Sequence, residues 1–235
     1  MIHGFGGDHN SWRMLVAAAA LPRPVLAIDL PGHGRSPAGA TTFESIVQAV
    51  ADAISSEGVT SADLVGHSLG AAVAAGVVET GRIAARSLFL LAPAGLGPDI
   101  NREFLAGFCR ARSEAALAPW MSMLVADAVS LPAVFIQVTA QTRAQPGVAE
   151  AQQRMADEIF PDGRQAFSIR PILARTTVPS RVVFGVADRI IPAAHMDGLP
   201  DTVAQHVFAD LGHMPQIEAS EPVAHLLVTH LRTVA

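Results

Sequence analysis

The sequence predicts one α/β domain: a mostly parallel sheet, helices on both of its faces, and a helical cap. Strand-length apolar runs alternate with amphipathic helical patterns as far as Pro93 and again from Arg181, which is typical of parallel strands joined by right-handed crossovers. No strand-like run occurs between residues 99 and 160. A chain of 235 residues, half of them hydrophobic, is long enough for one such domain and too short for two ordinary enzyme domains.

The chain opens with Ile2-His3, which we interpret as the end of a buried strand, followed by a glycine loop at residues 4–7. A helix should begin near Asn10 or Ser11, both good N-cap residues. A central strand usually has about five or six residues, but two residues precede His3. We therefore expect the N-terminal strands of the sheet to be missing from this sequence.

The next elements follow an alternating order. The apolar runs 24–30, 62–65 and 87–92 have strand length and suit strands covered on both faces. Residues 42–57 carry apolar side chains at helical spacing, and a small-residue run at 69–80 predicts another helix. Together they predict strand, helix, strand, helix and strand before Pro93.

After Pro93 the pattern changes to helical stretches that prolines interrupt, which predicts three or four short helices. We interpret residues 97–166 as a cap insertion, and residues 1–96 and 167–235 as the two parts of the core. A cap of this kind would exclude water and shape a pocket. Beyond it, the sequence predicts a strand at 181–186, a helix near 193–199, a strand around 205–209 and a terminal helix at 222–233.

Composition excludes several functions. The net charge of −5 gives no basic surface for nucleic acid, and the longest apolar runs are too short to span a bilayer. All sixteen basic residues are arginine, so Schiff-base chemistry and covalent attachment of lipoate or biotin to this chain are excluded. The start does not resemble a signal peptide, and the lone cysteine, Cys109, fits a packed thiol in a reducing cytosol. We expect a cytoplasmic protein with no membrane or nucleic-acid partner.

The most informative motif is Gly66-His67-Ser68-Leu69-Gly70, a G-x-S-x-G pattern between a predicted strand and a predicted helix. Such a turn brings backbone segments into near contact, which leaves no room for a Cβ at Gly66 or Gly70. It lifts the Ser68 hydroxyl above the sheet and directs the first amides of the helix toward whatever the serine attacks. The pattern alone is weak, because it often occurs by chance.

A serine hydroxyl needs a base within hydrogen-bond reach, and the base needs a carboxylate to fix its tautomer. In a parallel sheet these groups come from loops that follow strand C-termini. Asp188 follows the predicted strand at 181–186, and His213 follows the last strand. The sequence therefore predicts Ser68, Asp188 and His213 as nucleophile, acid and base, in a chain order known for this type of sheet.

Other residues compete for the same roles. Asp210 is the main rival acid, although three residues before the histidine it fits a turn better, and Asp29 is a weaker alternative. Among the remaining histidines, four are most simply surface or packing residues: His195, His206, His225 and His230. His67 should point away from the serine, and His3 should orient the glycine loop by hydrogen bonding. His9 and His33 are loop residues whose positions give no reason to assign either of them the role of base.

The oxyanion that forms during attack at an acyl carbon needs two backbone donors. We predict the amide of Leu69, which follows the serine, and the amide of Phe5, which follows Gly4 in the glycine loop. Losing one such donor typically raises the barrier by about 3–4 kcal/mol. No H-E-x-x-H motif or Cys/His cluster is present, so no metal site is expected.

Seven blocks of sequence carry a family resemblance: HGFGGD (3–8), DLPGHGRS (29–36), LVGHSLG (64–70), LAPAGLGPDIN (91–101), FPDGRQ (160–165), DRIIPAAH (188–195) and GHMPQIEA (212–219). Over almost its whole length the chain resembles α/β-hydrolase-fold proteins. More narrowly, it resembles the hydrolase-fold acyltransferase domain of the dihydrolipoamide acetyltransferase component of acetoin dehydrogenase. The blocks at 91–101 and 160–165 are the more specific ones.

In that family a lipoyl domain, with a lysine that carries lipoate, precedes the hydrolase-fold domain. This chain has neither that domain nor any lysine, so it is either part of a longer protein or receives its acyl group from elsewhere. The resemblance implies acyl transfer through Ser68, with acetyl-dihydrolipoamide as donor, coenzyme A as acceptor and other acetoin dehydrogenase components as partners. Lipoamide and coenzyme A would then be substrates, with no cofactor bound covalently.

Two alternatives remain open. The same residues would serve a free-standing carboxylesterase, lactonase or C–C bond hydrolase, because the acceptor is chosen by the pocket and its dryness. A non-catalytic binding module or inactive fragment of the same fold is the third hypothesis. An intact set of Ser68, Asp188 and His213 argues against it, whereas missing strands would favour it.

Overall fold

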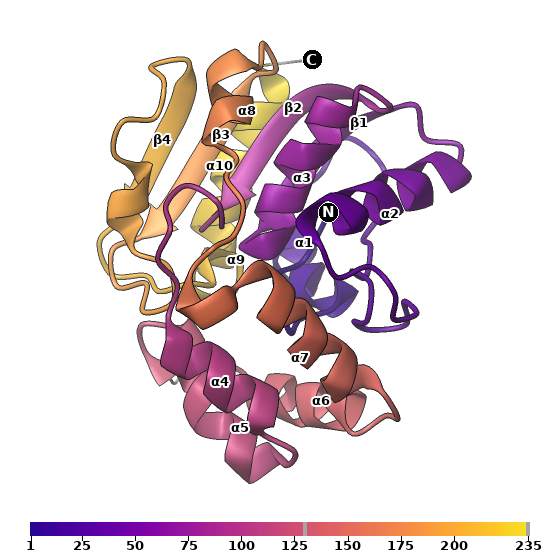
Figure 1. Ribbon diagram of the computed structural model, residues 1–235. Helices are drawn as coiled ribbons and strands as arrows, with labels where there is room; N and C mark the ends of the chain where they lie inside the picture. Colours follow the sequence, from indigo (N-terminus) through magenta and orange to yellow (C-terminus); the bar gives the residue numbers. More distant parts are fainter. Residues whose placement is uncertain (129–130, 234–235) are drawn as a thin grey trace.

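A computed structural model describes residues 1–128 and 131–233 of the chain. Its sheet has four parallel strands in the order β1 (Ser61–His67), β2 (Ala84–Leu91), β3 (Ser180–Gly185) and β4 (Val203–Phe208) (Figure 1). These strands occur where the apolar runs predicted them, with bounds that differ by one to three residues. The α/β class and the parallel sheet are confirmed.

The N-terminal side of the sheet corrects one prediction. Residues 24–30 do not form a regular strand: a single parallel bridge joins Ile28 to Ile2, and a second joins Ile2 to Gly66. To form a strand, residues 24–30 would need a ladder of hydrogen bonds to the segment around Ile2. That segment offers few backbone groups for such a ladder, because the chain turns into the glycine loop directly after His3. The hydrogen bonds here are therefore confined to residues close to these bridges, such as Ile28 N to Met1 O at 3.0 Å.

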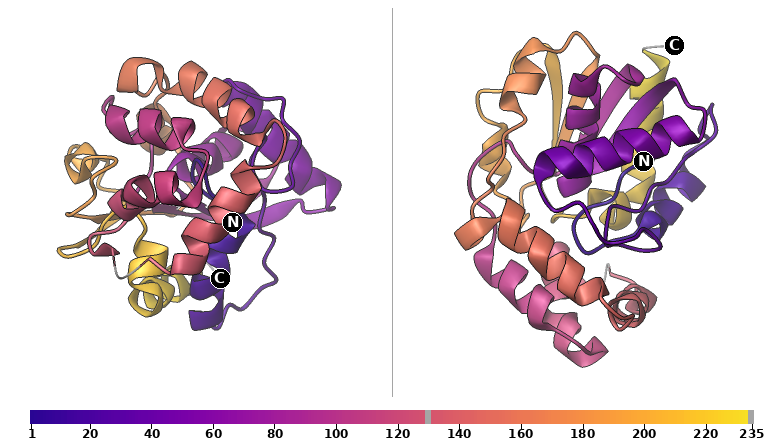
Figure 2. Two further views of the ribbon diagram at one scale, coloured as in Figure 1. Left: turned by 90° about the horizontal axis from the view of Figure 1, so that it is seen from below. Right: turned by 45° about the vertical axis from the view of Figure 1, so that its right-hand side comes forward.

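Both faces of the sheet are covered by helices. On one face, α2 (Phe43–Ser56) packs against α3 (Leu69–Thr80), and on the other α1 (Arg13–Ala18) packs against α10 (Ser220–Arg232) (Figures 1 and 2). The side chains of β2 divide between them. Leu88 and Leu90 belong to the core under α2 and α3, whereas Phe89 and Leu91 belong to the core under α1 and α10. Burial on both faces explains why this strand reads as a continuous apolar run.

The segment between β2 and β3 is helical in its described part, as the sequence predicts. It holds α4 (Arg102–Arg110), α5 (Glu114–Met121), α6 (Ala133–Arg143) and α7 (Val148–Ile159), with short 3-10 turns at η2 (Ser122–Leu124) and η4 (Pro161–Gly163). These helices gather at one end of the sheet (Figures 1 and 2). Helix α8 (Arg170–Arg175) leads back to the core. Residues 129–130 of this stretch lie outside the described residues, and the division at 97 and 166 stays a prediction.

Three local predictions need correction. The first helical turn is the 3-10 helix η1 (His9–Trp12), and Asp8 rather than Asn10 or Ser11 caps it by accepting a 2.8 Å hydrogen bond from Asn10 N. The helix expected at 193–199 is only a 3-10 turn, η5 (Ala193–Met196). A short helix, α9 (Pro215–Glu218), follows the predicted base and was not expected. Within the described ranges, no helix combines the length and apolar character that a membrane span requires.

Candidate active site

The turn at Ser68 has the close backbone contacts that the glycine spacing predicts. Ser68 has φ 53° and ψ −120°, an unusual conformation for a residue with a Cβ. A Cβ added at Gly66 would lie 2.4 Å from the carbonyl oxygen of Gly70, and one added at Gly70 would lie 2.2 Å from the carbonyl oxygen of His3. Surrounding hydrogen bonds hold the turn, including Ser68 N to Leu91 O at 2.9 Å. Both glycines are therefore required by close backbone contacts.

Asp188 and His213 lie together as acid and base would. The His213 Nδ1 donates to the Asp188 Oδ2 at 2.7 Å, and both side chains are almost fully buried. The other carboxylate oxygen, Oδ1, accepts from the amides of Ile190 and Ile191 at 2.8 and 2.9 Å. These bonds fix the carboxylate and leave the His213 Nε2 free to act as a base toward a nucleophile.

Ser68 and His213 line the same cavity, which has a volume of about 40 Å³. Within the described part of the chain, no hydrogen bond joins the side chains of Ser68 and His213. A hydrogen bond between a nucleophile and its base is often long until substrate binds. Apolar side chains from the glycine loop and the cap complete the walls: Phe5, Phe104, Phe108, Leu124, Phe135 and Phe160. Ser68 and His213 thus face one small, largely apolar space.

The glycine loop lies directly against the serine turn. A Cβ added at Gly4 would lie 2.8 Å from the His67 Nδ1 and 3.0 Å from the Ser68 Cβ. His3 orients this loop as predicted, because its Nδ1 donates to the Gly4 carbonyl at 2.8 Å and its Nε2 accepts from the Leu30 amide at 3.0 Å. The Phe5 residue lines the cavity, and Leu69 begins α3. Their amides stay the predicted oxyanion donors.

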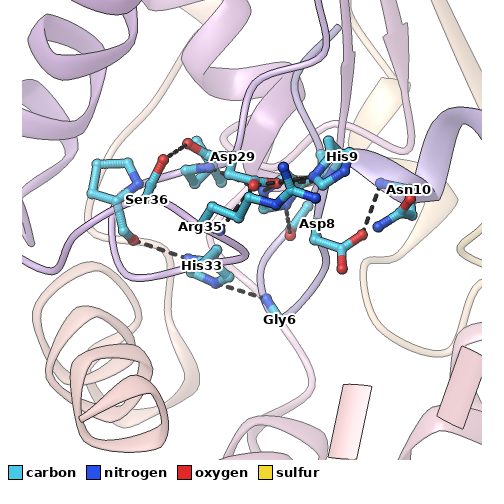
Figure 3. A network of polar contacts seen from close by, with 12 residues as sticks. Gly6, Asp8, His9, Asn10, Asp29, His33, Arg35 and Ser36 are labelled. Carbon is cyan, nitrogen blue, oxygen red and sulfur yellow. Dashed lines mark hydrogen bonds and ion pairs between the residues drawn. The ribbon is translucent and has the colours of Figure 1, made fainter. Parts of the chain in front are cut away.

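A second loop, residues 29–36, is hydrogen-bonded to the glycine loop (Figure 3). The Gly6 amide donates to the His33 Nε2 at 2.9 Å, while the His33 Nδ1 donates to the Pro31 carbonyl at 3.0 Å. Burial lowers the pKa of His33 to about 3, so this ring stays neutral and can accept. Sequence reasoning gave His33 no role, since its partner is 27 residues away and no local pattern reveals the contact.

Asp29 belongs to that supporting network, and it is not the carboxylate that accepts from His213. It accepts hydrogen bonds from the His9 amide at 2.7 Å, the His9 Nδ1 at 3.0 Å and the Arg35 amide at 2.9 Å (Figure 3). These bonds lower the pKa of the Asp29 carboxyl against the opposing effect of its burial. Asp29 therefore joins the two loops, and the described contacts of His213 place Asp188, not Asp29 or Asp210, beside its ring.

Three residues missed by sequence reasoning hold the loops that carry Asp188 and His213. The Glu218 carboxylate accepts from the amides on either side of His213, those of Gly212 and Met214, at 3.0 and 3.2 Å. Arg189 Nη2 donates to two cap carbonyls, Ser122 O and Val125 O, both at 2.6 Å. His67 contacts the loop that carries His213. The only sign of this contact in the sequence is the position of His67 next to Ser68. Glu218 could have been noticed in the sequence as a carboxylate shortly after His213.

The other histidines have separate surroundings. His195 Nε2 lies 3.8 Å from the Asp99 Oδ2, and His230 is buried against the ring of Phe89. Cys109 is a buried free thiol, and its burial raises its pKa to about 11, which suits a packing residue. Across the residues that the structure describes, no group of three or more His, Cys, Asp or Glu side chains has the arrangement of a metal site.

Known proteins match this chain in sequence over nearly its full length. Residues 1–226 match a family described as the alpha/beta hydrolase family. The dihydrolipoyllysine-residue acetyltransferase component of the acetoin cleaving system from Cupriavidus necator is 35% identical over 232 residues, 98% of this chain and 62% of that protein. The protein of the same name from Pseudomonas putida is 36% identical over 234 residues, 99% of this chain and 62% of that protein. The chain thus spans less than two thirds of either relative.

Solved structures agree with the fold. A meta-cleavage product hydrolase from Pseudomonas fluorescens IP01 superposes with a TM-score of 0.84 at 21% identity, covering 100% of this chain and 90% of that one. The 2-hydroxy-6-oxo-6-phenylhexa-2,4-dienoate hydrolase from Rhodococcus sp. strain RHA1 gives a TM-score of 0.85 at 22% identity, covering 98% and 89%. The family match, these structures and the acetoin-system relatives confirm the resemblance seen in the sequence. The chain belongs to the alpha/beta hydrolase family and is an enzyme of that fold.

Proposed function

We propose that this enzyme transfers a short acyl group from a thioester through an acyl-enzyme at Ser68. The observation that carries the proposal is the 2.7 Å hydrogen bond from His213 to Asp188, because it prepares a base that faces the same cavity as the strained serine. The acetoin-system relatives support acetyl as the group and dihydrolipoamide as its carrier. Coenzyme A is the proposed acceptor.

The chemistry follows from the positions of the groups. The His213 Nε2 takes the proton of Ser68 as the Oγ attacks the thioester carbonyl carbon, and Asp188 stabilises the resulting imidazolium. The amides of Phe5 and Leu69 would stabilise the oxyanion. When the C–S bond breaks, the departing thiolate takes the proton from His213. The acceptor thiol then gives its proton to His213 and attacks the acyl-enzyme carbonyl carbon. As the bond from that carbon to the Ser68 Oγ breaks, His213 passes the proton to Oγ and restores the hydroxyl.

The size of the site favours a small acyl group. A cavity of about 40 Å³ holds little more than an acetyl group, while bulky acyl chains would need the phenylalanine walls to move. In this proposal no cofactor is bound covalently. Lipoamide and coenzyme A act as substrates, and the other components of an acetoin-cleaving complex are partners in the cytoplasm.

The test compares wild type with Ser68→Ala on S-acetyl-dihydrolipoamide, measuring both acetyl-coenzyme A and free acetate. We expect serine-dependent formation of acetyl-coenzyme A that exceeds acetate release. Serine-dependent release of acetate alone would replace the transferase with a hydrolase, as in a carboxylesterase or lactonase. Equal rates for the two proteins would contradict the serine mechanism itself and favour a binding module. A C–C hydrolase would instead act on a dienoate ketone and ignore the thioester.

A further inference from the structure

A second cavity, of about 340 Å³, adjoins the catalytic one. Its walls come from the segment around α1 and from α6, two parts of the chain more than a hundred residues apart in sequence. Four residues line both cavities: Gly6 and Gly7 of the glycine loop, and Phe135 and Thr139, which lie one turn apart on α6. The two spaces thus meet at these four residues, and we call the larger one the α1–α6 groove.

The α1–α6 groove has an apolar surface that water reaches. Met14, Val134 and Val138 are 41%, 58% and 36% exposed, and all three line the groove. Single exposed apolar side chains are ordinary on a protein surface, but a cluster beside a catalytic cavity indicates a binding site. Such a surface fits a flexible aliphatic chain, which gains burial without needing specific polar partners.

The groove also has a polar lining, which includes Asp8, Asn10, Arg13, Thr142, Arg143 and Gln152. Arg143 is 3% exposed, and its guanidinium donates to backbone carbonyls at the end of α4, among them Phe108 O at 2.9 Å. Its Nε has no hydrogen-bond partner among the described residues. A buried donor without a partner is costly. Arg143 and Gln152 thus place a guanidinium and an amide beside the apolar part of the groove, where an amide of a bound chain would lie close to polar groups.

We propose that the α1–α6 groove binds the thiol-bearing arm of the acyl donor or acceptor, an aliphatic chain that carries an amide. The inference rests on the proposed function and extends it from the acyl group to its carrier. The catalytic cavity of about 40 Å³ has no room for such an arm, and the residues shared by the two cavities, Phe135 and Thr139 among them, lie between Ser68 and the groove that would receive it. Dihydrolipoamide and the pantetheine of coenzyme A share this chemistry, and the experiment distinguishes them.

The kinetic test fills the groove and compares thioesters that differ only in their arms. Val138→Trp is assayed with S-methyl thioacetate, S-acetyl-dihydrolipoamide and acetyl-coenzyme A. We expect the ratio of kcat/KM for a long-arm substrate to that for S-methyl thioacetate to fall roughly tenfold, mainly through KM. Selective loss for one long arm identifies the carrier that uses the groove. The matched control is Val207→Trp on β4, where an exposed valine lies outside both cavities.

Equal changes for all three substrates, or no change for any, would overturn the groove as an arm site. A binding test separates this result from failure of the proposed function. Ser68→Ala protein is titrated with lipoamide and with pantetheine in a calorimeter, with and without Val138→Trp. Weaker binding of at least one probe in the double variant supports the groove even if the serine proves not to be a nucleophile. Absence of binding alongside serine-dependent turnover overturns the groove and leaves the function intact.

Discussion

The ring Nε2 of His67 donates a 2.7 Å hydrogen bond to the backbone carbonyl oxygen of His213. His67, the residue before Ser68, therefore holds the loop that carries His213, the predicted base. The two rings are 4.9 Å apart between centroids, and the Nδ1 side of His67 lies against Gly4 of the glycine loop. One buried side chain thus connects the turn at Ser68, the loop at His213 and the loop predicted to bind the oxyanion.

We predict that His67→Phe lowers kcat about tenfold and leaves KM nearly unchanged. Phenylalanine keeps a ring of similar size but cannot donate, so the His213 carbonyl loses a buried hydrogen bond worth about 1–3 kcal/mol and the base shifts. Steady-state kinetics on a short acetyl ester measures the effect. His230→Phe is the control, because His230 is equally buried but packs against Phe89 on β2. A similar kcat loss in both variants would mean that His67 acts only through stability.

Glu218 should be a second positioning residue, because its carboxylate links the loop that carries His213 to the cap. Besides the amides of Gly212 and Met214, it accepts from Ala126 N in the cap segment at 2.7 Å. Glu218→Gln replaces one acceptor oxygen by a donor, so the side chain can no longer accept hydrogen bonds from all three amides. We expect kcat to fall about tenfold and the melting temperature to drop by several degrees, consistent with about 1–2 kcal/mol.

Glu221→Gln on the exposed start of α10 provides the matched control for that experiment. It makes the same chemical change without the three amides, and it should leave kcat and melting temperature near the wild-type values. If Glu218→Gln behaves like this control, the bonds from Glu218 do not position the base.

The glycines of the serine turn allow a prediction about folding rather than catalysis. Gly70→Ala would place a Cβ 2.2 Å from the carbonyl oxygens of both Ile2 and His3, and backbone atoms cannot move aside easily. We expect at least about 3 kcal/mol of destabilisation or failure to fold, measured by urea unfolding. Gly58→Ala is a contrasting variant. Nothing lies within 4 Å of its added Cβ, so its cost comes only from its φ of +73° and should be about 1–2 kcal/mol.

Sequence reasoning located the strands and the candidate triad because both depend on local patterns. The run 87–92 is apolar throughout, since Leu90 and Phe89 pack on opposite faces of the sheet. Asp188 and His213 could be selected because strand C-termini meet at one edge, and the structure brings their side chains together. The roles of the site residues themselves stay predictions until the variants are assayed.

What sequence reasoning missed depends on partners far away in the chain. His33 accepts from Gly6, and His67 donates to a residue 146 positions later. Neither contact leaves a periodic or compositional signal. The strand expected at 24–30 failed for a related reason: its apolar run is adequate, but a ladder also depends on the length of the neighbouring segment at Ile2. Local propensity predicts elements better than it predicts the contacts between them.

The buried histidines around the serine predict that the fold weakens in mild acid. Burial lowers the pKa of His33 to about 3 and also lowers the pKa values of His3 and His67. In the unfolded chain each would titrate near 6.5. The unfolded state therefore binds more protons between about pH 6.5 and 3, so stability present above pH 6.5 is lost as the pH falls through this window.

For His33 alone this linkage amounts to about 2 kcal/mol between pH 7 and pH 5, since its ring stays neutral in the folded state at both values. His33→Gln can still accept from the Gly6 amide but has no titrating ring. We expect urea unfolding to show that the difference in stability between wild type and His33→Gln shrinks by about 2 kcal/mol from pH 7 to pH 5. His225→Gln, at an exposed position on α10, should keep the wild-type pH dependence. If His33→Gln and wild type lose stability in parallel, the His33 ring takes up its proton in the folded protein as readily as in the unfolded chain, and the protonated ring cannot accept from Gly6.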